Sequence, residues 1–104
     1  MAKMKQIEIG GKKYTFELDR DRIIKAEEVY GVSITKVEER IVSQSYKTWV
    51  AGLDKHHGKL SVGERMDLYD EYNQETGKSM EVVSYLMETI GNFINPTQAK
   101  KEKK

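Results

Sequence analysis

The N-terminal part of the chain alternates between apolar and polar positions with a period of two, around a pair of glycines. The apolar members of this pattern are Ile7, Ile9, Tyr14, Phe16 and Leu18. Gly10 and Gly11 can both adopt a positive φ, as the two central residues of a tight hairpin turn must. The pattern therefore predicts a β-hairpin that runs from about Met4 to Leu18.

A two-residue turn also fixes which residues of the predicted strands face each other. The expected pairs are Ile9 with Lys12, Ile7 with Tyr14 and Lys5 with Phe16 on one face, and Glu8 with Lys13 and Gln6 with Thr15 on the other. Because an isolated two-stranded hairpin is only marginally stable in water, its apolar face must lie on helices or on another chain.

Beyond the hairpin the apolar residues recur every three or four positions, which is the spacing of amphipathic helices. A first helix is expected between Asp19, which can cap its N-terminus, and Gly31, which can end it. Its apolar residues are Ile23, Ala26 and Tyr30.

The segment from Thr35 to about Lys55 admits two interpretations. Its start has the spacing of a capping box, because Glu38 follows Thr35 by three residues. A strong apolar stripe comes next, at Val42, Tyr46, Trp49, Val50 and Leu53. The segment is either one long helix or two helices joined near Ser43 to Ser45, and we favour the break.

Two further helices are expected. Ser61 and Glu64 have capping-box spacing at the start of one of them, and Gly77 would end it. The last begins with Ser79 as its N-cap and stops before Pro96, because proline disfavours a helical conformation in the residue that precedes it. The elements together predict an α+β fold, mostly α, in which an N-terminal hairpin and four to five short helices form one small domain over residues 1–96.

Composition narrows the class of protein. Hydrophobic residues make up 38% and charged residues 34% of 104 positions, and there is no cysteine. No apolar run approaches the roughly 18 residues of a membrane span, and the start lacks the apolar stretch of a secretory signal. We expect a cytoplasmic protein without disulfides that does not enter a membrane.

Charge is distributed unevenly along the chain. The whole chain carries +1, but residues 97–104 contain four lysines and one glutamate, so the rest of the chain carries −2. We expect this basic tail to be disordered, since it has almost nothing to bury. The slightly acidic body makes nucleic acid an unlikely partner, because surfaces that bind DNA or RNA concentrate cations.

Two short motifs suggest ligand chemistry but lack its context. The run Thr76-Gly77-Lys78-Ser79 resembles the end of a phosphate-binding P-loop, yet Tyr72 stands where that motif needs a glycine, and a helical pattern precedes it. His56 and His57 are neighbours whose side chains diverge on a helix, so they cannot chelate one ion, and we expect a polar loop there. Asp54 with His57 would supply only two ligands.

The acidic residues Asp67, Asp70 and Glu71 are expected to form a solvated helix face, because nothing marks a pair of them as buried. No nucleophile motif or zinc spacing is present in the sequence. We therefore predict no catalytic residue, no cofactor and no metal site.

Large aromatic side chains give the best candidates for function. The stripes around Trp49 and Phe93 fit a buried core, which is the more common fate of such helix faces. However, six tyrosines, one tryptophan and five methionines are many for so small a body, and these residue types are enriched in binding surfaces. The candidate protein-binding residues are Tyr46, Trp49, Leu53, Tyr72, Tyr85 and Phe93.

The order of these features resembles that of a known family. The hairpin Gly10-Gly11-Lys12-Lys13-Tyr14-Thr15-Phe16 is followed by Val29-Tyr30-Gly31-Val32-Ser33, by Trp49-Val50-Ala51-Gly52-Leu53 and by Leu60-Ser61 at a helix start. This order is similar to that of the tail assembly chaperones of long-tailed bacteriophages of Gram-positive hosts. Family members often carry an acidic residue and a proline after the Ala-Gly-Leu element, where this chain reads Asp54-Lys55-His56-His57-Gly58.

The resemblance implies a helper of phage or prophage tail assembly in the cytoplasm of the bacterial host. Such a protein would bind the hydrophobic tape measure protein, keep it soluble until the tail tube protein polymerises around it, and associate with itself. The resemblance also implies a longer form made by ribosomal frameshifting. The alternative is a small phage or prophage regulator that binds nucleic acid through a helix and the lysine tail. Neither function is enzymatic.

Overall fold

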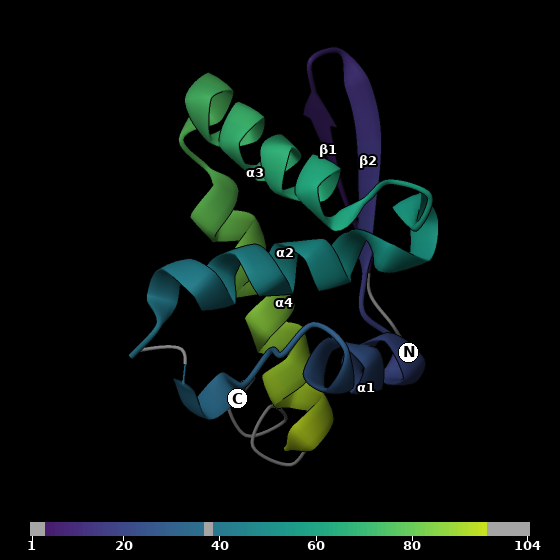
Figure 1. Ribbon diagram of the computed structural model, residues 1–104, viewed down its shortest axis with the longest axis vertical. Coiled ribbons are helices and arrows are strands. Elements are labelled where there is room, and N and C mark those ends of the chain that lie inside the picture. Colours follow the sequence, from purple (N-terminus) through teal and green to yellow (C-terminus); the bar gives the residue numbers. More distant parts are fainter. Residues whose placement is uncertain (1–3, 37–38, 96–104) are drawn as a thin grey trace, which may run out of the picture.

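The computed structural model describes residues 4–36 and 39–95 (Figure 1). Its elements are β1 (Met4–Ile9), β2 (Lys12–Glu17), α1 (Arg20–Glu28), the 3-10 helix η1 (Ile34–Lys36), α2 (Ile41–His57), α3 (Val62–Thr76) and α4 (Ser79–Ile94). The predicted α+β fold, a hairpin followed by short helices, is confirmed. Glu38 of the expected capping box and the basic tail lie outside the described residues.

The hairpin has the predicted turn and register. Gly10 and Gly11 have φ of 57° and 79°, and every expected pair occurs, from Ile9 with Lys12 to Lys5 with Phe16. The N–H of Gly10 donates to the Glu75 carboxylate at the end of α3, 3.1 Å from the nearer oxygen. The helices of the same chain cover the apolar face of the hairpin, since Ile9 and Phe16 are buried in the core.

α2 lies across the middle of the molecule and packs against α1, α3, α4 and β2 (Figure 1). Gly52 of this helix makes the close packing possible. A Cβ atom at this position would lie 2.7 Å from Leu86 of α4, closer than real Cβ atoms approach, and 3.0 Å from Phe16 of β2, which is tighter than most such contacts. A side chain at position 52 would therefore force these neighbours or the helix itself to shift.

The start of α2 corrects the expected position of the break. Two helical pieces do occur, η1 and α2, but they are separated before Ile41 rather than near Ser43 to Ser45. Ser45 lies inside the helix, where its hydroxyl donates to the carbonyl oxygen of Ile41 at 2.5 Å. A serine that is satisfied by the carbonyl of the preceding turn does not interrupt a helix.

The caps of the other helices follow the sequence closely. Asp19 accepts a hydrogen bond from the Arg22 N–H at 2.9 Å, and Ser61 and Glu64 form both bonds of a capping box. Gly77 ends α3 in the left-handed conformation. Ser79 is an exception, because it is the first residue of α4 and not its N-cap; its hydroxyl donates to the Tyr69 carbonyl oxygen at 2.8 Å and so ties α4 to α3.

Among the described helices, none combines the length and the apolar character needed to cross a membrane.

Candidate protein-binding surface

The six candidate residues do not form one surface. Trp49 and Leu53 are both 0% exposed, so in the folded chain neither is available to a partner. The Trp49 ring meets Phe16 edge-on at a centroid distance of 4.7 Å, and its N–H donates to the Arg65 carbonyl oxygen at 2.9 Å. The core interpretation of the Trp49 stripe is the one that the structure supports.

Tyr46 and Tyr72 are half-buried beside Trp49, where α2 and α3 meet. The Tyr46 ring lies 4.5 Å from that of Tyr69, and its hydroxyl donates to the Asp70 carboxylate. This hydrogen bond, with some help from burial, raises the pKa of Tyr46 to about 12. Both tyrosines serve the packing of the two helices and are only partly exposed.

Tyr85 and Phe93 lie on α4, away from the Trp49 cluster. Phe93 is 51% exposed near the end of the helix. Tyr85 is half-buried, and the Lys5 ammonium of β1 sits 5.5 Å from the centre of its ring. Tyr85 therefore marks the place where α4 and β1 adjoin.

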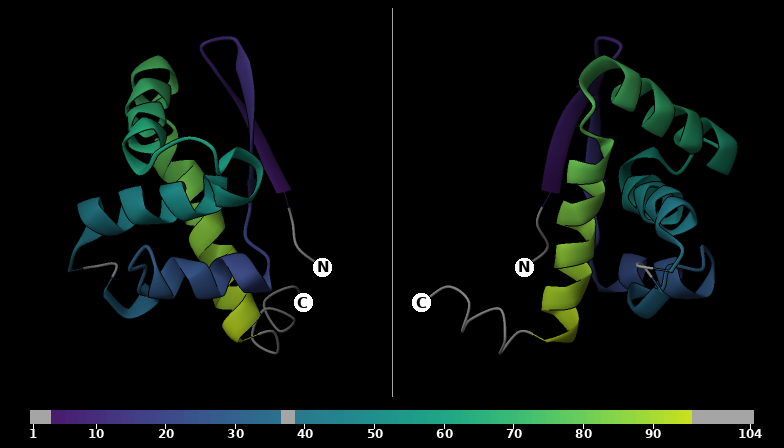
Figure 2. Two further views of the ribbon diagram at one scale, coloured as in Figure 1. Left: turned by 45° about the vertical axis from the view of Figure 1, so that its right-hand side comes forward. Right: turned by 90° about the vertical axis from the view of Figure 1, so that its left-hand side faces the viewer.

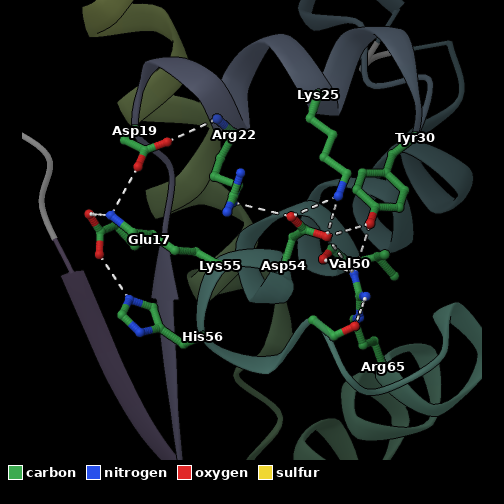
Figure 3. A network of polar contacts seen from close by, with 11 residues as sticks. Glu17, Asp19, Arg22, Lys25, Tyr30, Val50, Asp54, Lys55, His56 and Arg65 are labelled. Carbon is green, nitrogen blue, oxygen red and sulfur yellow. Dashed lines mark hydrogen bonds and ion pairs between the residues drawn. The ribbon is translucent and has the colours of Figure 1, made fainter.

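A buried carboxylate that the sequence suggested only as half of a two-ligand pair holds three helices together (Figure 3). Asp54 of α2 accepts a hydrogen bond from the Tyr30 hydroxyl at 2.7 Å and from the Lys25 ammonium at 3.0 Å. Arg65 of α3 lies 3.5 Å away. Arg22 is paired with it at 3.2 Å by charge alone, because the geometry of a hydrogen bond is not met.

The environment of Asp54 keeps it ionised. Burial by itself would raise the pKa of this carboxyl, but the hydrogen bonds from Tyr30 and Lys25 and the charges of Lys25 and Arg22 outweigh it and lower the pKa below its usual value. Arg65 is itself 4% exposed and also donates to the carbonyl oxygens of Leu60 and Val50. The network has the character of a structural brace, because Asp54 and Arg65 are both engaged by groups from other parts of the chain.

A second cluster lies beside the first, at the end of β2 (Figure 3). The Lys55 ammonium is 2.9 Å from both Glu17 and Asp19, and His56 Nε2 is 2.9 Å from Glu17. The hydrogen bonds from Lys55 and His56 lower the pKa of Glu17, and the bond from Lys55 lowers that of Asp19. The cluster fastens the end of the hairpin to α2.

The expected polar loop at His56 and His57 is wrong, because both residues belong to the last turn of α2. His57 Nε2 accepts a hydrogen bond from the Thr15 N–H of β2 at 3.0 Å, so this nitrogen carries no proton. Burial, followed by the charges of His56, Arg65 and Lys12, lowers the pKa of His57. The two histidines face different partners, and the described part of the chain contains no group of three potential metal ligands.

The remaining motifs lie where the sequence placed them. Asp67, Asp70 and Glu71 are exposed on α3. The run from Thr76 to Ser79 is the turn between α3 and α4, and the two hydroxyls in it are bonded to carbonyl oxygens of α3. This turn has no preceding strand, which a P-loop requires.

Comparison with protein family models, with curated proteins and with solved structures finds no match for this chain. The fold and the surface together describe a small α+β domain in which buried charges brace the helices. Most of its aromatic residues lie in the core or pack against it, whereas Phe93 of α4 is exposed.

Proposed function

We propose that this protein is a binding module of the tail assembly chaperone type, which holds the tape measure protein of its phage or prophage in soluble form during tail assembly. The order of elements described above supports this assignment, as does the confirmed hairpin-and-helix fold. The proposal includes self-association and involves no catalytic step. The buried carboxylates Asp54 and Glu17 are consistent with it, since cations of the same chain engage both.

The observation that carries the proposal is the exposure of large apolar side chains where helices meet. The hydroxyl of Ser45 lies 2.5 Å from the carbonyl oxygen of Ile41 and 3.2 Å from the sulfur of Met80, so the starts of α2 and α4 adjoin. Ile41, Val42 and Met80 are 43%, 68% and 40% exposed at this junction. Apolar side chains gathered on a surface are typical of sites that bind other proteins.

Co-expression tests the proposal. The tape measure protein is produced with the full chain, with an empty vector, or with the I41S/M80Q variant. Two quantities are measured: the soluble fraction of the tape measure protein, and the amount of it that a tagged form of this chain captures. We expect the full chain to raise solubility and the variant to lose most of this effect. Val29→Ser is the matched control, because Val29 is also exposed but lies on α1.

Unchanged solubility together with failure to capture a complex would refute the proposal. Salt-dependent binding to duplex DNA that disappears when residues 97–104 are removed would instead favour a regulator. Sedimentation of the purified chain tests self-association in the same preparation.

A further inference from the structure

The two edges of the hairpin differ. In an antiparallel pair the backbone groups of successive residues point alternately toward the partner strand and away from it. Ile9 and Lys12 flank the turn and bond to each other, so the N–H and C=O groups of Gln6 and Glu8 point away from β2. Thr15 is paired with Gln6, so its backbone groups also point away from the partner strand. Its N–H accordingly donates to His57.

The outer edge of β2 is thus occupied at its centre, whereas that of β1 is open. The sheet formed by the described residues contains β1 and β2 only. Gln6 and Glu8 are exposed. Unpaired strand edges are templates for a further strand, which would bond to the outward amides and carbonyls of these two residues.

α4 lies beside this edge. In the right-hand view of Figure 2 the helix stands in front with β1 next to it, and the contact of Lys5 with Tyr85 joins the two. The outer face of the helix is hollowed between Met80, Glu81, Ser84, Tyr85 and Glu88. Glu81 and Glu88 are exposed, and neither forms an ion pair with a described residue.

We propose that the outer edge of β1 and the hollow on α4 form one docking surface for an extended segment of another protein, in which an apolar and a basic side chain alternate on the side that faces α4. The backbone of the segment bonds to Gln6 and Glu8. Its apolar side chain rests on Met80 and Tyr85, and its lysine or arginine meets Glu81 and Glu88. The inference rests on the proposed protein-binding function, but not on the identity of the partner.

The dimensions fit a short segment. From Met80 to Glu88 the helix rises about 12 Å, at 1.5 Å per residue. An extended strand covers that length with about four residues, of which every second one faces the helix. One apolar and one basic side chain therefore match the two kinds of group that line the hollow.

A second copy of this chain is a poorer occupant. The helix-facing side chains of its own β1 are already in use, because Ile9 is 2% exposed in the core and Lys5 lies over Tyr85. If β1 of the second copy presented its opposite face to α4, its Glu8 would face the carboxylates of Glu81 and Glu88 and be repelled. A segment from a different protein avoids both conflicts.

Fluorescence anisotropy of the full chain tests this surface. The probe is a capped, labelled peptide of about eight residues. Threonine occupies every second position, and valine and lysine take turns at the positions between, so that one face of the extended peptide presents both valine and lysine. Two control peptides carry glutamate in place of lysine, or N-methyl groups on the alternate amides that would bond to β1. We expect the probe to bind and both controls to bind at least about tenfold more weakly.

Two charge-reversal variants locate the site. E81K/E88K is expected to weaken probe binding about tenfold, whereas E27K/E28K, which makes the same charge change at exposed positions of α1, changes it by less than about twofold. Gln6→Pro removes the outward N–H, together with the side-chain bond from Gln6 to Thr15, and so should also weaken binding, while circular dichroism checks that it folds. If that variant does not fold, the charge-reversal pair and the methylated peptide still decide.

The proposal is overturned if the probe does not bind, if the methylated peptide binds as well as the probe, or if both charge reversals act equally. It is also overturned if E81K/E88K dissociates a dimer but leaves the affinity for the probe unchanged. That result would mean that a second copy of the chain binds at this surface. A chain that binds the probe but not the tape measure protein contradicts the proposed function alone. A chain that solubilises the tape measure protein but ignores the probe contradicts this surface alone.

Discussion

The side chains of Trp49 and Arg65 each donate a hydrogen bond to the backbone of the other residue's helix. The indole N–H of Trp49 donates to the backbone carbonyl of Arg65 at 2.9 Å, and the guanidinium of Arg65 donates to the backbone carbonyl of Val50, next to Trp49, at 3.2 Å. One partner is apolar and the other charged, yet both are buried. This reciprocal pair fixes how α3 lies on α2, and it makes the stability of the chain sensitive to either residue.

Trp49→Ala should lower the free energy of unfolding by about 3–5 kcal/mol, because it removes a fully buried ring and leaves a cavity. Urea denaturation followed by circular dichroism measures this. Phe93→Ala, at a position 51% exposed, is the control and should cost less than about 1 kcal/mol. Unchanged stability in Trp49→Ala, with weakened binding to a partner, would contradict the core assignment.

Asp54→Asn should cost about 3–5 kcal/mol, because it leaves the buried charge of Arg65 without its counter-ion. Asp67→Asn, on the exposed face of α3, should change the stability by no more than about 0.5 kcal/mol. The same denaturation experiment compares the two. Equal stability of both variants would show that the Asp54 network does not brace the fold.

Protonation of His57 should destabilise the chain. Its pKa is lowered in the folded state, so as pH falls below about 6.5 the unfolded chain takes up a proton before the folded chain does. The stability that neutral His57 provides is complete above that pH and is lost as pH falls through the folded-state pKa. His57→Gln keeps an oxygen that can accept from Thr15 but does not titrate.

The measurement for this prediction is the unfolding free energy as a function of pH in both proteins. His56 is present in both, so the difference between the two curves belongs to His57. The wild-type protein should lose stability more steeply than His57→Gln just below pH 6.5. Parallel curves would mean that burial does not lower the pKa of His57 in the folded chain.

Tyr46 should resist ionisation, as should Tyr69 and Tyr85, whose pKa values are raised mainly by burial. The hydrogen bond of Tyr46 to Asp70 raises its pKa to about 12, against about 10 in the unfolded chain, so its contribution to stability is present below pH 10 and is lost as pH rises toward 12. Absorbance titration should show a late phenolate step that Tyr46→Phe removes and Asp70→Asn shifts to lower pH. A step unaffected by either change would assign it to another tyrosine.

Gly52→Ala should destabilise the chain by about 1–3 kcal/mol, because its Cβ atom would collide with Leu86 and Phe16. Gly63→Ala is the matched control. It lies in α3 with only the Ser61 hydroxyl within 4 Å of an added Cβ atom, at 3.9 Å, and alanine favours the helix by up to about 1 kcal/mol. Thermal unfolding of both variants should therefore shift in opposite directions.

Local rules predicted most of the fold. The glycine pair determined the turn and the strand register, and Asp19, Ser61 and Gly77 marked helix ends correctly, because each acts through backbone bonds within a few residues. The break before Ile41 was misplaced, since Ser45 can either interrupt a helix or bond back to it, and the local sequence does not distinguish these outcomes.

The polar interior was missed for a different reason. Asp54 lies in α2, Arg65 in α3 and Tyr30 just after α1, and only the tertiary fold shows that they meet. A signal was nevertheless present, because Arg65 stands at the helical spacing of Leu68, Tyr69 and Tyr72, on the face that packs inward. A charged residue at such a position indicates a buried ion pair. The same limit applies to Tyr85, whose neighbour Lys5 lies at the other end of the sequence.

The bond from Thr15 to His57 also limits how many chains can be joined through the hairpin. A sheet with two free edges can add strands on both sides and grow into a fibre. Here one side is already sealed at its middle by the chain's own helix. A further strand can therefore be added at the edge of β1 but not at the middle of β2, so the hairpin cannot extend from both sides at once.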